Sequence, residues 1–160
     1  MTTHATSRSS RVLLIDADQD SWELYAEFLA SAGLEVVTVS DGHGATELVA
    51  TLRPAAVVTD VRLRGGIDGL EVTRRLRADD RTKRIPVIVL TADEACCADA
   101  LAAGCELFLT KPCAPAALAS EIRLLMERTA HSERSGASKT RKRRTIAARG
   151  RKYDAKSVDR

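Results

Sequence analysis

Short apolar runs alternate along the chain with longer segments in which apolar residues recur every three or four positions. The runs are nearly continuous in Val, Leu and Ile, as expected for strands buried on both faces. The predicted strands are residues 11–15, 35–39, 56–59, 86–90 and 107–109. The predicted helices are residues 19–32, 44–52, 69–78, 94–103 and 115–128. This alternation predicts an α/β domain with a doubly wound parallel sheet and helices on both faces.

Polar residues stand where four of these strands end. Asp16, Asp60 and Thr91 directly follow apolar runs, and Lys111 follows Leu107-Phe108-Leu109-Thr110. If the strands are parallel, their ends meet at one edge of the sheet, where open α/β sheets bind ligands. Asp60 is therefore a candidate nucleophile or metal ligand, with an acid, a hydroxyl and an ammonium beside it.

The charge of the chain is unevenly distributed. Residues 129–160 hold 11 Lys/Arg and 3 Asp/Glu, a net charge of +8. Residues 1–128 hold 14 Lys/Arg and 19 Asp/Glu, a net charge of −5, so the whole chain carries +3. The basic segment has too little apolar content to offset its ordering entropy. We therefore expect a disordered N-terminus over 1–10, a folded domain over 11–128 and a basic disordered tail over 129–160, with transient helix near 145–149.

The composition of the chain bears on membrane association, secretion and the redox state of its cysteines. No apolar run approaches the roughly 20 residues needed to span a bilayer, and residues 1–10 lack the apolar core of a secretory signal. We expect no membrane association and a cytoplasmic location. The four cysteines match no zinc or redox spacing, which favours reduced thiols in a reducing compartment. They are Cys96, Cys97, Cys105 and Cys113.

Four motifs, in order and at matching spacing, make residues 11–128 resemble the receiver domain of two-component response regulators. They are Leu14-Ile15-Asp16-Ala17-Asp18, Val58-Thr59-Asp60 with Gly65-Gly66-Ile67-Asp68-Gly69-Leu70, Pro86-Val87-Ile88-Val89-Leu90-Thr91-Ala92, and Ala103-Gly104-Cys105 through Leu109-Thr110-Lys111-Pro112. The resemblance implies a (βα)₅ flavodoxin-like fold with strand order 2-1-3-4-5. It also places Lys111-Pro112 where the family holds a cis peptide.

The resemblance assigns roles to the polar strand ends. Asp60 would be the phospho-acceptor, because a carboxylate can attack a phosphoryl group held in line. Mg²⁺ and Lys111 would neutralise the crowded negative charge. The ion would be held by Asp16, Asp60 and the backbone carbonyl of Arg62, and the Thr91 hydroxyl would follow the new phosphoryl oxygen. Such a domain is not an enzyme beyond its own phosphorylation and dephosphorylation.

One departure from the family pattern concerns the metal. The family usually has two adjacent acids after its first strand, and the second is commonly a direct metal ligand. Here that position is Ala17, and the next acid is Asp18. Mg²⁺ binding is therefore expected but weakened, with water filling the gap. Asp18 instead complements the dipole at the start of the following helix.

Three further residues are expected to modulate the site. By resemblance, Arg62 and Asp93 flank its entrance, where an ion pair between them could shield an acyl phosphate from water. The alternative is an exposed Arg62 with negligible effect. Phe108 stands where the family often has an aromatic that swings inward on activation, and its alternative role is that of an ordinary core residue.

The leading hypothesis is a stand-alone receiver, because only 32 residues follow residue 128. It would accept a phosphoryl group on Asp60 from a sensor histidine kinase or phosphotransfer protein and signal through a changed partner-binding face. Deleting residues 130–160 is expected to leave this phosphorylation intact. One alternative is a pseudo-receiver, an interaction module whose metal-dependent chemistry is impaired by Ala17.

Two other possibilities remain open. Asp16-Ala17-Asp18 after a strand resembles the paired acids of haloacid-dehalogenase phosphatases, although Asp20 and the lack of a cap domain speak against that family. The basic segment 139–152 could contact nucleic-acid phosphates weakly and in a salt-dependent way. It could equally fold over the acidic body or bind an acidic partner.

Overall fold

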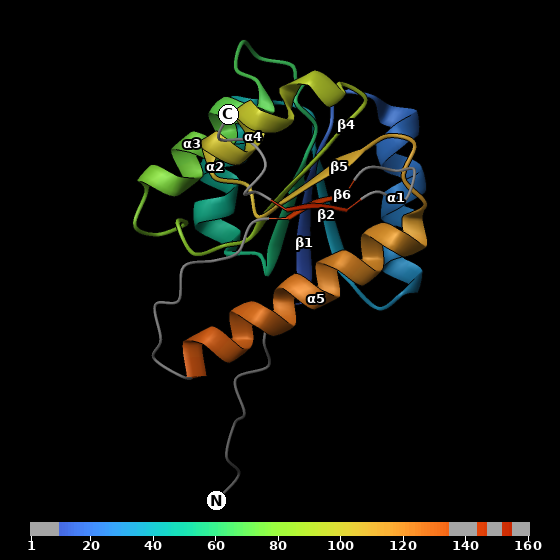
Figure 1. Ribbon diagram of the computed structural model, residues 1–160, viewed down its shortest axis with the longest axis vertical. Coiled ribbons are helices and arrows are strands. Elements are labelled where there is room, and N and C mark those ends of the chain that lie inside the picture. The colour runs from blue at the N-terminus through green and yellow to red at the C-terminus, as the bar shows by residue number, and fades with distance from the viewer. Residues whose placement is uncertain (1–9, 135–143, 147–151, 155–160) are drawn as a thin grey trace, which may run out of the picture.

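The computed structural model describes residues 10–134, 144–146 and 152–154. Its core is a sheet of five parallel strands in the order β2-β1-β3-β4-β5 (Figure 1). The strands are β1 (Arg11–Ile15), β2 (Glu35–Val39), β3 (Ala56–Thr59), β4 (Val87–Thr91) and β5 (Leu107–Thr110). The predicted fold class and strand order are confirmed, and each strand boundary lies within one residue of its prediction.

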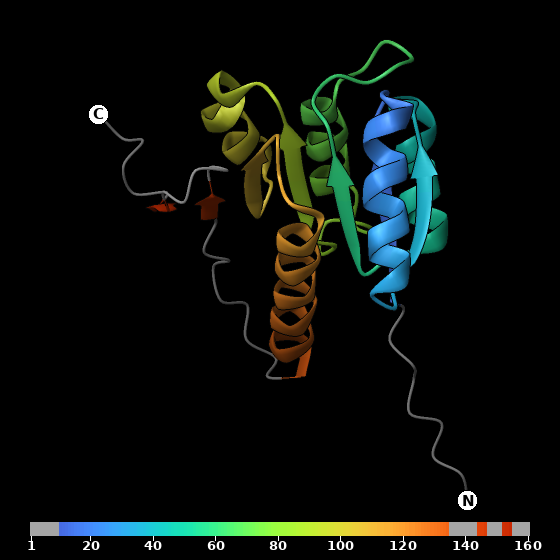
Figure 2. The same cartoon turned by 90° about the vertical axis from the view of Figure 1, so that its right-hand side faces the viewer.

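Helices cover both faces of the sheet. Helices α1 (Gln19–Ser31) and α5 (Pro115–Arg134) lie on one face (Figures 1 and 2). The other face carries α2 (Gly42–Leu52), α3 (Gly69–Ala78) and α4 (Cys97–Ala103). The single helix expected over 94–103 is divided, because a 3₁₀ turn, η1 (Glu94–Cys96), precedes α4.

The alternation of side chains along each strand builds a core on each face. In β1, Val12 and Leu14 pack in a cluster with α1 and α5, whereas Leu13 and Ile15 pack in a cluster with α2 and α3. All four side chains are at most 2% exposed. The sheet is thus anchored from both sides, and the ends of its strands are held in fixed positions.

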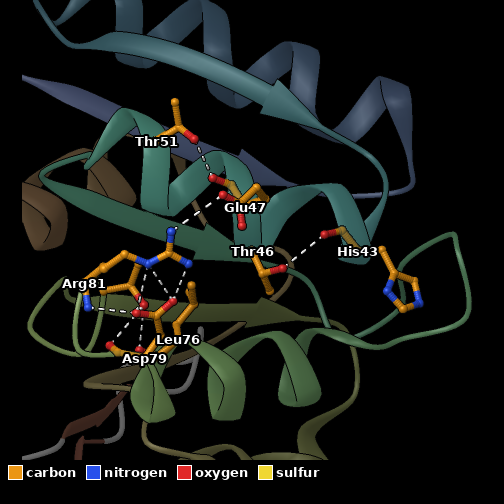
Figure 3. Close-up of polar contacts among 8 residues, drawn as sticks. His43, Thr46, Glu47, Thr51, Leu76, Asp79 and Arg81 are labelled. Carbon is orange, nitrogen blue, oxygen red and sulfur yellow. Dashed lines mark hydrogen bonds and ion pairs between the residues drawn. The ribbon is translucent and has the colours of Figure 1, made fainter.

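Surface contacts join the loop after α3 to α2 (Figure 3). Arg81 pairs with Asp79 at 2.7 Å and, more loosely, with Glu47 of α2 at 3.6 Å. These side chains are substantially exposed, so the pairs contribute little to stability. The hydroxyls of Thr46 and Thr51 donate to carbonyls one turn earlier in α2. These contacts are local to α2 and to the loop after α3, and they include none of the polar residues that follow the strands.

The C-terminal segment differs most from expectation. Helix α5 continues to Arg134, six residues beyond the predicted end of the domain at 128. Two short strands follow, β6 (Arg144–Ile146), which pairs in parallel with β5, and β7 (Lys152–Asp154), which pairs antiparallel with β6. A wholly disordered tail is therefore wrong for these segments, and a strand replaces the helix expected near 145. Pairing with the edge of a sheet has overridden a polar composition.

The other parts of the predicted termini, residues 1–9, 135–143, 147–151 and 155–160, lie outside the described residues. Where the domain begins and ends thus stays a prediction. Among the helices that the structure describes, none combines the length and apolar character required to cross a bilayer.

Candidate functional site

A three-residue ionic cluster lies at the carboxyl edge of the sheet. Asp16 follows β1, Asp60 follows β3 and Lys111 follows β5. The Lys111 ammonium Nζ donates to Asp16 Oδ2 at 2.7 Å and to Asp60 Oδ2 at 2.9 Å. Their side chains are only 17%, 7% and 13% exposed for Lys111, Asp16 and Asp60 respectively. One ammonium therefore serves two carboxylates, which gives the cluster one negative charge in excess.

The backbone at Asp60 is closely packed against the first residue of α3. An added Cβ at Gly69, the first residue of α3, would lie 1.9 Å from the carbonyl oxygen of Asp60. The Thr59 hydroxyl donates to that same carbonyl at 2.8 Å. The Val61 N–H donates to Asp60 Oδ1 at 2.5 Å, which fixes the carboxylate with its other oxygen toward Lys111. The sequence predicted Gly69 as part of the family motif and as the first residue of a helix, and the structure adds its close packing against Asp60.

Asp16 is held in a similar way. Its Oδ1 accepts the backbone N–H of Asp18 at 2.9 Å, while its Oδ2 accepts Lys111. Asp18 occupies the N-cap position of α1, is exposed, and makes no side-chain capping bond. Its placement agrees with the expected helix-start acid. Ala17 between them is half-buried and supplies no ligand atom from its side chain.

The loop that carries Lys111 is tied to α1. The Lys111–Pro112 peptide bond is cis, as the family resemblance implies. The Tyr25 hydroxyl donates to the carbonyl of Cys113 at 3.0 Å and is buried, so burial raises the pKa of Tyr25. Sequence reasoning missed this contact, because Tyr25 and Cys113 lie 88 positions apart and no motif joins them.

The charge state of Lys111 follows from its surroundings. Burial alone lowers the pKa of a lysine, but the hydrogen bonds to Asp16 and Asp60 and the charges of both carboxylates outweigh it. The pKa of Lys111 is therefore raised above its ordinary value. The side chain stays protonated across the physiological pH range as the fixed cation of the cluster.

A pocket of ≈ 750 Å³ opens above the cluster. It is lined by Asp16, Ala17, Asp18, Asp60, Arg62, Arg64, Thr91, Ala92, Asp93 and Lys111. The structure thus brings together all but one of the residues singled out from the sequence. The exception is Phe108, which is 1% exposed and packs with Leu70, Ala100 and Leu101 in the core beneath α4.

The entrance differs in detail from the expected arrangement. Arg62 and Asp93 are both described and both exposed, and no ion pair joins them. Asp93 instead caps η1, where its Oδ1 accepts the N–H of Ala95 at 3.0 Å. Thr91 is 2% exposed, and its hydroxyl accepts only a long 3.4 Å bond from the Asp93 N–H. Its hydroxyl proton is available to a new acceptor in the pocket.

Mg²⁺ prefers oxygen ligands in octahedral geometry, and the carboxylates of Asp16 and Asp60 are ligands of that kind. Two fixed carboxylates with an excess negative charge fit such an ion chemically. The described residues contain no group of three His, Cys, Asp or Glu side chains placed to hold a metal. Asp16 and Asp60 are therefore the two carboxylates that such an ion would find here, and the Ala17 side chain supplies none.

The comparisons with known proteins agree with this geometry. The sequence profile of the response regulator receiver domain matches residues 12–123, and the chain belongs to that family. Response regulator MprA of Mycolicibacterium vanbaalenii is 37% identical over 132 residues, which are 80% of this chain and 55% of that protein. MprA of Mycobacterium leprae is 39% identical over 123 residues, 74% of this chain and 52% of that protein. The chain thus spans about half the length of these curated relatives.

Solved structures show the same fold. The receiver domain of sensor histidine kinase PA1611 from Pseudomonas aeruginosa, with magnesium coordinated in its active-site cleft, matches with a TM-score of 0.69 and 29% identity. That match covers 73% of this chain and 97% of the other. The receiver domain of the Francisella response regulator 1452 matches with a TM-score of 0.68 and 26% identity, over 74% and 98% of the two chains. Membership in this family supersedes the haloacid-dehalogenase alternative.

Proposed function

We propose that this receiver domain accepts a phosphoryl group on Asp60 and transmits the change through its protein-binding surface. The observation that carries the proposal is the placement of Lys111, whose ammonium bridges the mostly buried carboxylates of Asp16 and Asp60 at the base of an open pocket. A structural ion pair would need one carboxylate per ammonium. The second carboxylate gives the site an unbalanced charge and a nucleophile.

The proposed reaction is a displacement at phosphorus. An oxygen of the Asp60 carboxylate attacks the phosphoryl group, a new P–O bond forms, and the donor leaves with the electron pair of the broken bond. Lys111 moves part of its contact from Asp60 to the incoming phosphoryl oxygens and neutralises their charge. The Thr91 hydroxyl donates to one of these oxygens. Mg²⁺, held by Asp16, Asp60 and the Arg62 carbonyl, would supply further charge neutralisation when bound.

The partners follow from the class of protein. The MprA relatives are response regulators, and PA1611 is a sensor histidine kinase. We infer that a sensor histidine kinase or phosphotransfer protein phosphorylates Asp60, and that a downstream protein reads the result. The stand-alone arrangement and the cytoplasmic location stay predictions. So does nucleic-acid contact by residues 139–152, most of which lie outside the described residues.

A pseudo-receiver is the second candidate, and Ala17 is the observation that favours it. In that case the fold serves only as an interaction module. The intact cluster of Asp16, Asp60 and Lys111 argues for retained chemistry, because an unbalanced buried charge is costly to keep without a use.

Phosphodonor labelling separates the two candidates. The full chain is incubated with acetyl phosphate, with and without Mg²⁺, and its intact mass is measured. We expect a Mg²⁺-dependent gain of one phosphoryl group that Asp60→Asn removes. The matched control is Asp80→Asn, at a carboxylate that is 89% exposed and distant from the pocket, which should label like wild type. A wild-type protein that gains no phosphoryl group at any Mg²⁺ concentration would establish the pseudo-receiver.

A further inference from the structure

Strand β5 forms the edge of the five-stranded sheet, and the chain covers this edge with its own C-terminal strands. Leu107, Phe108 and Leu109 of β5 pair in parallel with Arg144, Thr145 and Ile146 of β6. Strand β7 pairs antiparallel with β6 on the far side (Figures 1 and 2). We refer to β6 and β7 together as the C-terminal strand pair. An uncovered edge strand presents unpaired backbone groups that attract other chains, so its cover controls access to it.

Charge favours this pairing. Residues 139–152, which include β6, hold eight Lys and Arg and no Asp or Glu. Residues 85–110, which run from before β4 to the end of β5, hold four acids and no Lys or Arg. Within this basic segment, Arg144, Thr145 and Ile146 pair with β5. We expect the opposite net charges of the two segments to favour this pairing, in a way that salt screens. Of the alternatives for the basic tail, the pairing of residues 144–146 with β5 favours contact with the folded domain of the same chain.

The covered strand is also the strand that positions the site. Thr110, the last residue of β5, pairs with Thr91 of β4, and Lys111 follows at once. The Lys111 N–H donates to the Thr91 carbonyl at 2.8 Å, and the Lys111 ammonium bridges the two carboxylates. Strand β5 is thus hydrogen-bonded on both sides. On one side it pairs with β4, which carries Thr91, and on the other it pairs with the C-terminal strand pair.

We propose that the C-terminal strand pair is a detachable clamp on β5 that favours the unphosphorylated form of the domain and is released when Asp60 is phosphorylated. The inference rests on the proposed function. The clamp is paired with β5 in the arrangement in which Lys111 contacts Asp60 directly. Phosphorylation of Asp60 replaces the single charge of the carboxylate by the roughly two negative charges of an acyl phosphate, and adds three strong acceptor oxygens beside Lys111. Lys111 and Thr91 must then shift, and the ends of β4 and β5 shift with them.

The clamp is suited to release because it is small. Only three residues of β6 pair with β5, and an isolated pair of short strands is marginally stable at best. Because so few backbone bonds hold the clamp, we expect a small change in the twist of β5 to break most of them. Released, the clamp uncovers the β5 edge for a protein partner that adds a strand.

Thermodynamic linkage supplies the test. If phosphorylation releases the clamp, then a disrupted clamp must increase the affinity of the site for a phosphoryl analogue by the same factor. The probe is beryllium fluoride with Mg²⁺, which occupies the place of a phosphoryl group on a carboxylate. The variants are Thr145→Pro and Ile146→Pro in the full chain, since proline removes a strand N–H and is tolerated poorly within paired strands. Ser157→Pro, beyond both strands, is the matched control.

Two readouts are needed. Hydrogen exchange of residues 107–109 in the unliganded protein reports whether the clamp is paired, and both strand variants should exchange faster there than the control. Fluorescence of Trp22, the single tryptophan, reports binding of beryllium fluoride. We expect each strand variant to bind the analogue about fivefold more tightly than wild type, the lower end of ordinary allosteric coupling. In wild type, saturation with the analogue should speed exchange at residues 107–109 and 144–146.

The outcomes are distinguishable. Faster exchange in the variants with unchanged analogue affinity overturns the clamp as a regulator and leaves Asp60 phosphorylation standing. Unchanged exchange overturns the pairing itself. If acetyl phosphate and beryllium fluoride both fail to react with wild type, the proposed function fails first, and the inference fails with it. Circular dichroism of each variant checks that the five-stranded domain remains folded.

Discussion

Two ionic clusters lie at opposite ends of the sheet and differ in their charge balance. At the amino end, Glu106 stands just before β5, and its Oε2 accepts Arg77 of α3 at 2.5 Å and the Val87 N–H at 2.7 Å. At the carboxyl end, Asp16 and Asp60 share the single ammonium of Lys111. Both clusters are mostly buried. Only the second has more carboxylates than cations.

The amino-end cluster is saturated. The Arg77 guanidinium also donates to the carbonyls of Gly104, Lys83 and Ile85, at 2.9, 3.1 and 2.8 Å. These bonds tie the end of α3 to the loops that precede β4 and β5. Gly104 adopts φ 111°, and a Cβ there would lie 2.8 Å from Arg77 Cγ, so the glycine makes room for the arginine. The amino-end network of Arg77 and Glu106, which we call the closed cluster, holds the fold. The carboxyl-end cluster of Asp16, Asp60 and Lys111, which we call the open cluster, retains capacity for a cation or a phosphoryl group.

Removal of Arg77 tests the closed cluster and should have the largest effect on stability. Arg77→Met removes the guanidinium that pairs with the buried Glu106 carboxylate and that donates to the carbonyls of Gly104, Lys83 and Ile85. Loss of one partner of a buried pair costs about 3–5 kcal/mol, measurable as a shift in urea unfolding. Arg74→Met is the control, because Arg74 is 51% exposed and pairs only with Glu71 on the surface, and it should change stability by less than about 0.5 kcal/mol. Equal effects of the two substitutions would contradict the distinction between the clusters.

In the open cluster, loss of the cation should destabilise the fold, whereas loss of one carboxylate should not. Lys111→Met leaves two carboxylates without a cation and should lower the free energy of unfolding at neutral pH by about 2–3 kcal/mol. Asp60→Asn leaves a balanced pair of Asp16 and Lys111, so stability should stay the same or rise by up to about 1 kcal/mol, while phosphorylation is lost. Urea unfolding of both variants beside wild type provides the comparison. A large destabilisation by Asp60→Asn would show that this cluster is structural after all.

A third prediction concerns the missing acid. Ala17→Asp adds a carboxylate to the wall of the pocket and should tighten Mg²⁺ binding about tenfold, or roughly 1.4 kcal/mol. Titration of Trp22 fluorescence with MgCl₂ measures the change. Ala92→Asp places an acid elsewhere on the same wall and controls for a general gain in negative charge. Equal gains for both variants would mean that position 17 has no special relation to the ion.

The comparison also shows what the sequence could predict. The open cluster was predictable, because Asp16, Asp60, Thr91 and Lys111 each follow an apolar strand and parallel strands bring their ends together. The closed cluster was not, because Arg77 looks like an exposed helix residue and its partner Glu106 lies 29 positions away. The contact of Tyr25 with Cys113 and the packing of Gly69 against Asp60 were not predicted for the same reason. Their roles depend on contacts between elements, which strand periodicity does not encode.

The C-terminal strands were wrongly predicted for a related physical cause. Residues 144–146 and 152–154 have no apolar run or alternation that favours a strand. They become strands by pairing with the unpaired edge of β5, a tertiary interaction. The composition of these residues reflects only their local preference, and it contains no information about the β5 edge with which they pair.

The smallest expected effect is the loss, at alkaline pH, of the stability that Lys111 contributes. The pKa of Lys111 is raised above its ordinary value of 10.5, because its bonds and charge interactions with Asp16 and Asp60 outweigh burial. A raised pKa in the folded state gives stability that is fully present below the unfolded-state pKa and is lost as pH rises through the folded-state value. The stability difference between wild type and Lys111→Met should therefore be constant from pH 7 to about 10 and shrink above that. Urea unfolding across this range measures it. A difference that already falls between pH 7 and 9 would mean that Lys111 loses its proton more easily than an ordinary lysine, which a cluster with a surplus carboxylate forbids.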